Sequence, residues 1–69
     1  MNYLFDNNLS FAAKGLLTLL IHLQEGGVQL NVDTASHYCE DNYNFALYEL
    51  QQDGYVKGSW TLEAHDNNG

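Results

Sequence analysis

The sequence predicts an α+β domain in which three helices pack with a short three-stranded antiparallel sheet. Two observations carry this prediction. Three segments repeat their apolar residues at the spacing of a helix, and three short segments have the alternating or β-branched composition of strands, next to glycine turns. With 69 residues the chain is long enough for one domain, which we place at residues 1–64. Residues 1–8 are expected to form an extended arm, and residues 65–69 a disordered tail.

The first helix is predicted from residue 11 to about residue 24, with Ser10 as its N-cap. Gly15 lies inside this helix and costs up to about 1 kcal/mol relative to alanine, which suggests that another backbone passes close to it. Apolar residues at helical spacing predict a buried stripe at Ala13, Leu16, Leu17, Leu20 and Leu23.

The middle of the chain predicts a strand and a short helix. Residues 26–27 are both glycine and end the first helix, and residues 28–30 alternate apolar and polar side chains as a strand does. Asn31 is placed to cap a second helix over residues 32–40, where Val32, Ala35 and Cys39 form a narrow apolar stripe.

The third helix and a hairpin complete the domain. Apolar residues at helical spacing in this helix are Tyr43, Ala46, Leu47 and Leu50. Either Asp41 or Asn42 is expected to cap its start, and Gly54 to end it in the left-handed conformation. Residues 55–57 and 60–63 are predicted as strands joined by a type II′ turn at residues 58–59.

Bulk composition limits the class of protein. A chain of this length buries only about 60% of its unfolded surface, so a partner or a second copy is expected to add stability. No apolar run approaches the roughly 20 residues that span a bilayer, and the first residues do not form a signal peptide. Together with the single cysteine, Cys39, these features favour a cytoplasmic protein.

Charge is the most informative property of the sequence. The formal net charge is −7, and no basic residue lies between Lys14 and Lys57. Affinity for nucleic acid comes largely from Lys and Arg side chains that neutralise phosphates, so this chain should be repelled by duplex DNA. Six acidic residues lie in the same interval: Glu25, Asp33, Glu40, Asp41, Glu49 and Asp53.

Three segments resemble a known family. They are LS at residues 9–10, AKGLL at residues 13–17 and ALYELQQDGYV at residues 46–56. These segments are similar to the winged helix-turn-helix domain at the front of phage and plasmid replication-initiation proteins and related regulators. The resemblance implies three helices with a short wing, and a last helix that reads DNA. Family members that bind DNA are basic along that helix, whereas this chain has Asn44, Phe45 and Tyr48 there.

Enzymatic and metal chemistry find little support in the sequence. His37 and Cys39 have the residue types of a metal site, but side chains two apart on a helix point in different directions, and no second ligand pair follows. No nucleophile, base and acid can be assembled convincingly, and no phosphate-binding loop is present. We therefore expect no enzyme activity, no cofactor and no metal.

The leading hypothesis is an acidic module that binds another protein with a basic surface, not nucleic acid or a membrane. Concretely, it would be a phage or mobile-element inhibitor, of the anti-CRISPR or anti-restriction type, that blocks the nucleic-acid-binding surface of a host protein. Exposed aromatic residues would anchor the partner, and acidic residues would stand in for phosphates. Scattered surface aromatics without function, a DNA-binding regulator, and homodimer assembly through Tyr3, Leu4 and Phe5 are the alternatives. The predicted partner-binding residues are Asp33, Glu40, Asp41, Asn44, Phe45, Tyr48, Glu49, Asp53 and Trp60.

Overall fold

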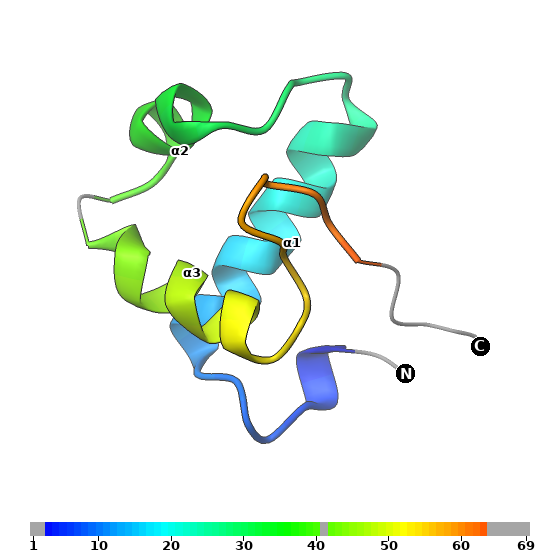
Figure 1. The fold of residues 1–69 in the computed structure, drawn as a ribbon, viewed down its shortest axis with the longest axis vertical. Coiled ribbons are helices and arrows are strands. Elements are labelled where there is room, and N and C mark those ends of the chain that lie inside the picture. The colour runs from blue at the N-terminus through cyan, green and yellow to red at the C-terminus, as the bar shows by residue number, and fades with distance from the viewer. Residues whose placement is uncertain (1–2, 41, 64–69) are drawn as a thin grey trace.

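The computed structural model describes residues 3–40 and 42–63 as an all-helical fold (Figure 1). One turn of 3-10 helix, η1 (Tyr3–Phe5), precedes three α-helices: α1 (Phe11–Glu25), α2 (Val32–Tyr38) and α3 (Tyr43–Gln52). Helix α1 runs through the middle of the molecule, α3 crosses it, and α2 stands at one end (Figure 1). None of these helices is both long enough and apolar enough to cross a membrane.

The predicted three-stranded sheet is wrong, because no strand forms among the described residues. The backbone of residues 28–30 is already used by the neighbouring helices. The Val28 amide donates to the Leu23 carbonyl at the end of α1 (2.9 Å), and the Gln29 carbonyl accepts from the Thr34 hydroxyl at the start of α2 (2.6 Å). These two groups are therefore not available for a ladder with another strand.

The C-terminal segment forms one antiparallel bridge, between Val56 and Leu62. Its turn also differs from the predicted type II′, which requires a positive φ at Gly58. In the structure the positive φ lies two residues later, at Trp60 (66°), and the Trp60 amide donates to the Lys57 carbonyl (2.9 Å). An aromatic residue is uncommon in this conformation.

Helix α1 begins and ends as its sequence predicts. The Ser10 hydroxyl accepts a hydrogen bond from the Ala13 amide (3.1 Å). At the other end the Gly27 amide bonds the Gln24 carbonyl (3.0 Å), and the φ of 86° at Gly27 turns the chain so that the Val28 amide bonds the Leu23 carbonyl (2.9 Å). The predicted stripe is confirmed, because its five members are all buried: Ala13, Leu16, Leu17, Leu20 and Leu23.

Helix α3 ends in the same way at Gly54, as predicted. Gly54 has a φ of 82°, its amide bonds the Gln51 carbonyl (3.2 Å), and the Tyr55 amide bonds the Leu50 carbonyl (2.8 Å). This arrangement is the Schellman motif, which turns the chain sharply after a helix. It directs the next residues back onto α1, so that both Tyr55 and Val56 are buried.

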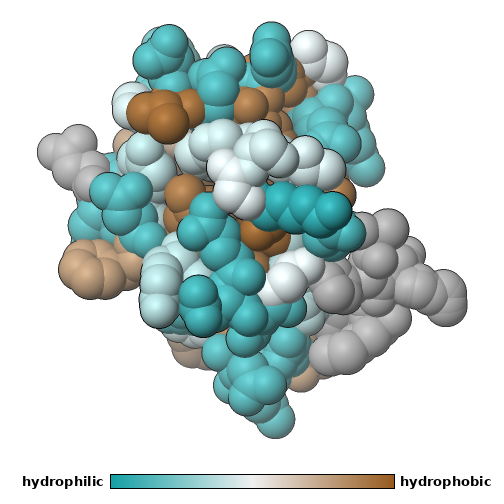
Figure 2. All heavy atoms as spheres, in the orientation of Figure 1, coloured by the Kyte–Doolittle hydropathy of each residue, from teal (hydrophilic) through white to brown (hydrophobic). Residues whose placement is uncertain are grey.

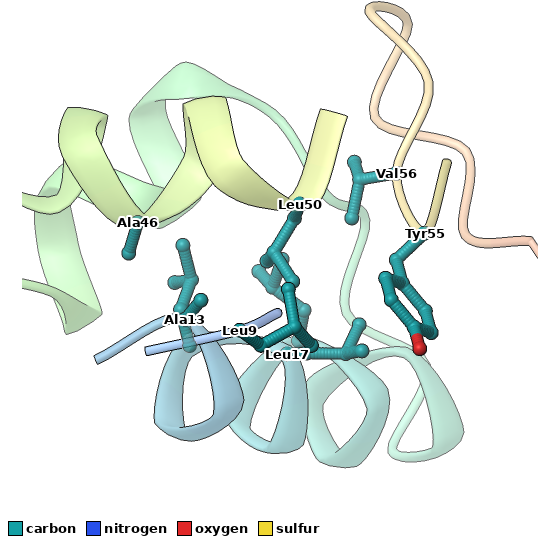
Figure 3. Packing of buried hydrophobic residues seen from close by; sticks show 9 residues of the cluster. Leu9, Ala13, Leu17, Ala46, Leu50, Tyr55 and Val56 are labelled. Carbon is teal, nitrogen blue, oxygen red and sulfur yellow. The ribbon is translucent and has the colours of Figure 1, made fainter. Parts of the chain in front are cut away.

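The hydrophobic core lies between α1 and α3, which make the most extensive contact between helices in the described part of the chain (Figure 3). Leu20, Leu50 and Val56 are its largest fully buried side chains. Burying a side chain of this kind contributes on the order of 1.5–3 kcal/mol. The cluster consists of Leu9, Ala13, Leu16, Leu17, Leu20, Ala46, Leu50, Tyr55 and Val56.

Helix α2 is shorter than predicted and buries little. Its N-cap is confirmed, since the Asn31 side chain accepts from the Thr34 amide (2.9 Å). The helix stops at Tyr38, where Cys39 turns to an extended conformation (φ −116°, ψ 160°). Ala35 is its only buried residue. At the start of α3, Asn42 is the N-cap by position, although its side chain makes no capping hydrogen bond there.

The segment predicted as an extended arm contains η1 and folds against the domain. The Tyr3 hydroxyl lies 2.6 Å from the Thr18 hydroxyl of α1, and its ring meets the Tyr55 ring edge-on, with centroids 6.3 Å apart. Tyr55 in turn donates its hydroxyl proton to Asp6 (2.7 Å). The predicted tail at residues 65–69 lies outside the described residues.

Candidate functional site

The outer face of α3 carries exposed aromatic side chains. Ala46 and Leu50 hold the helix against α1 with its opposite side, which leaves Phe45 78% exposed and Tyr48 62% exposed. Residues three apart on a helix lie on the same side, so the two rings share one surface. Asn44 is exposed one residue before Phe45. We call Asn44, Phe45 and Tyr48 the α3 face.

Acidic residues predicted to bind a partner lie on several elements. Asp33 is exposed in the first turn of α2, Glu40 is exposed between α2 and α3, and Asp53 is exposed at the end of α3. Asp41 lies outside the described residues. The exposed carboxylates of Glu40 and Asp53 therefore flank α3 at its two ends, whereas Asp33 belongs to α2.

Glu49 has a structural contact that the sequence did not suggest. Its side chain is half-buried, and its carboxylate accepts a hydrogen bond from the Ser10 amide (2.9 Å), 39 residues away. A carboxylate that receives a backbone N–H at a helix N-terminus compensates one of the unpaired amides of that terminus. Glu49 therefore fastens α3 to the start of α1, and this contact occupies one of its two oxygens.

Trp60 also differs from its predicted place. The predicted hairpin places it opposite Lys57 as a partner-binding residue, but its side chain is half-buried and packs against the hydrophobic core. Lys57 instead pairs with Glu63, with a distance of 3.3 Å between Nζ and Oε2. Trp60 is therefore better described as a core residue than as part of an exposed surface.

Both lysines of the chain contact side chains outside α3. Lys14 lies over the Phe11 ring, with Nζ 5.7 Å from the ring centroid, and Lys57 pairs with Glu63. No basic side chain belongs to α3. On the side of the molecule seen in Figure 2, hydrophilic side chains predominate and hydrophobic surface is confined to separate patches. A phosphate backbone would find no cation on α3 to bind.

A groove of about 450 Å³ lies between α1, α3 and the segment that leads into α3. This groove was not predicted from the sequence, because it depends on how α1 and α3 pack. Its one available signal was Gly15, which we expected to be contacted by another backbone. That expectation is wrong, since a Cβ atom at Gly15 would meet nothing within 4 Å. The groove is lined by Ala12, Gly15, Leu16, Leu19, Cys39, Glu40, Asn42, Tyr43, Phe45 and Ala46.

The pKa values of Cys39 and Tyr55 are both raised. Burial raises the pKa of the Cys39 thiol above its ordinary value of 9.0, which makes this cysteine a poor nucleophile near neutral pH. Burial, the hydrogen bond to Asp6 and the charges of Asp6 and Asp53 raise the pKa of Tyr55 from 10.0 to about 12. Both residues therefore stay protonated near neutral pH.

The residue types of a metal site do not come together in the described part of the chain. His37 meets the Tyr38 ring edge-on, with centroids 4.7 Å apart. No group of three His, Cys, Asp or Glu side chains there is close enough to hold a metal ion.

Comparison with protein-family models, curated proteins and solved structures found no match to this chain.

Proposed function

We propose that this chain is an acidic protein-binding module whose α3 face docks on a basic surface of another protein. The observation that carries the proposal is that α3 exposes Phe45 and Tyr48 and has no basic residue. Exposed aromatic side chains supply much of the binding energy in protein interfaces, whereas a DNA-reading helix depends on Arg and Lys.

Exposed acids on and around α2 and α3 supply the second part of the recognition. Asp33, Glu40 and Asp53 are exposed, and the net charge of −7 attracts a basic partner over a distance of about a Debye length. Charges at the edge of an interface mainly raise the association rate and select the partner. Glu49 has a smaller part in this proposal than the sequence suggested, because it already binds the Ser10 amide.

In its concrete form, the partner is a host protein whose basic surface normally binds nucleic acid, and this chain occupies that surface as an inhibitor. Exposed carboxylates would take the places of phosphates. The resemblance to phage and plasmid replication-initiation proteins supports a phage or mobile-element origin, and the anti-CRISPR or anti-restriction type is the case in view. A cytoplasmic location belongs to the same proposal.

The experiment uses three purified versions of the chain as bait: wild type, Phe45→Ala with Tyr48→Ala, and Phe5→Ala. Phe5 is a matched control because it is also 78% exposed but lies on η1. Each bait is incubated with host lysate, and captured proteins are identified by mass spectrometry. We expect a nucleic-acid-binding protein that is captured by wild type and Phe5→Ala and lost with the double variant.

A low-salt gel shift with duplex DNA tests the alternative of a DNA-binding regulator. At low salt, electrostatic binding to DNA is at its strongest. We expect no retarded duplex even at the highest protein concentration. A retarded band would favour the regulator, and equal capture by all three baits would remove the α3 face from the proposal.

A further inference from the structure

The groove beside α3 has the composition of a site for one long cationic side chain. Its walls are apolar along α1, where Ala12, Leu16 and Leu19 contribute, and Glu40 is an exposed carboxylate at its lining. Lysine and arginine bury their methylene groups against apolar surface while their charged ends stay at a polar boundary. No lysine or arginine of this chain belongs to the lining.

Aromatic rings add a second reason for a cation. Tyr43 and Phe45 both line the groove, and the face of an aromatic ring attracts an ammonium or guanidinium group. The guanidinium group of arginine can also form two parallel hydrogen bonds with a carboxylate such as that of Glu40. Arginine fits this combination better than lysine, because its planar group both stacks on rings and pairs with a carboxylate.

Gly15 keeps the groove open at the cost of helix stability. A glycine inside a helix is less favourable than alanine by roughly 0.5–1 kcal/mol. Nothing in the structure fills the place of its missing side chain, and its φ is not positive, so the fold itself does not require glycine here. A larger side chain at this position would project into open space beside the groove lining.

We propose that the groove receives an arginine side chain of the partner, with its methylene groups on α1, its guanidinium group on Glu40 and its backbone passing over Gly15. The proposal rests on the proposed function, because it names the group of the basic partner that this site recognises. Phe45 belongs to both the α3 face and the groove lining, so the separate test uses Gly15 and Glu40, which lie outside the α3 face.

The test is an NMR titration of the whole chain, labelled with ¹⁵N, with the acetylated and amidated tripeptide Gly-Arg-Gly. Two control peptides replace arginine with citrulline, which keeps the shape without the charge, or with norleucine, which keeps an apolar stem alone. We expect saturable shifts at the amides of Gly15, Leu19 and Ala46 with the arginine peptide. Binding of either control peptide should be roughly tenfold weaker, the effect of losing about 1.4 kcal/mol.

Variants of the chain locate the site. Gly15→Leu fills the open space and should abolish these shifts, whereas Gln24→Leu, an exposed position of α1 outside the groove lining, should bind as wild type. Glu40→Gln should lower affinity for the arginine peptide, because the guanidinium group loses its carboxylate partner. Thermal unfolding of each variant shows that it is folded, and Gly15→Leu is expected to unfold no lower than wild type.

Three results would overturn the arginine site. The first is that the norleucine peptide binds as tightly as the arginine peptide, and the second is that Gly15→Leu binds the arginine peptide as wild type does. The third is that amide shifts appear at Asp33 and Asp53 but not at the groove lining. If one of these occurs while Phe45→Ala with Tyr48→Ala still loses the captured partner, the proposed function stands and only the arginine site fails. If the double variant keeps its partner while the groove shifts appear, the groove binds arginine and docking through the α3 face fails.

Discussion

The carboxylate of Glu49 accepts a hydrogen bond from the backbone amide of Ser10, the residue whose hydroxyl caps α1. In a capping box the acid that bonds the N-cap amide lies three residues further along the same helix. That position is Ala13 here, and Glu49 of α3 supplies the carboxylate instead. The N-terminus of α1 is thus capped in part by a side chain of α3, the helix that packs across it.

Replacing Glu49 with alanine should destabilise the fold. The Ser10 amide would lose its partner, and loss of a capping interaction costs about 1 kcal/mol, within a range of roughly 0.5–2 kcal/mol. Urea denaturation of Glu49→Ala and of Asp53→Ala measures this difference, since Asp53 is an exposed acid on the same helix end. Equal unfolding free energies for the two variants would show that the bond contributes nothing.

Gly15→Ala should stabilise the chain by roughly 0.5–1 kcal/mol, because a Cβ atom fits there and reduces the entropy of the unfolded chain. Gly54→Ala should have the opposite effect on stability. Gly54 has a φ of 82°, and this conformation costs a residue with a side chain about 1–2 kcal/mol. Thermal unfolding should therefore move up for the first variant and down for the second. A lower unfolding temperature for Gly15→Ala would mean that the open space is needed for the fold.

Stability should fall in alkali through Tyr55. Its pKa is about 12 in the folded chain, compared with an ordinary value of 10.0. Between these values the unfolded tyrosine loses its proton while the folded one keeps it, so rising pH favours the unfolded state. The loss is on the order of 2–3 kcal/mol once the pH exceeds both values.

Tyr55→Phe removes this titration and serves as the comparison. The unfolding free energies of wild type and Tyr55→Phe are measured at pH 8 and pH 11.5, and other groups that titrate in this range contribute to both proteins. Wild type should lose more stability than the variant over this interval. An equal loss would show that Tyr55 ionises as freely in the fold as in the unfolded chain.

The sequence predicted the parts of the fold that depend on neighbours along the chain. The caps at Ser10 and Asn31, the end of α3 at Gly54 and the buried stripe of α1 follow from local hydrogen bonding and helical spacing. Exposure of Phe45 and Tyr48 was predicted for the same reason, since the opposite face of α3 had to be buried.

Features that depend on pairing across the chain were missed. The composition of residues 28–30 suits a strand, but the Val28 amide bonds Leu23 and the Gln29 carbonyl bonds Thr34, which ties the segment to the two neighbouring helices. Glu49 looked like a surface acid because its partner, Ser10, is 39 residues away. The groove was missed for a related reason, since its lining joins α1 to α3 and to the segment between α2 and α3.

The most direct test of the central claim is displacement of nucleic acid from a captured partner. The partner is first bound to a fluorescently labelled nucleic acid, and anisotropy is followed as wild type, Phe5→Ala or Phe45→Ala with Tyr48→Ala is added. Wild type and Phe5→Ala should release the nucleic acid, and the double variant should need at least roughly tenfold more protein, as expected when interface anchors are removed. Formation of a ternary complex without release, or binding of the labelled nucleic acid by this chain itself, would contradict the account.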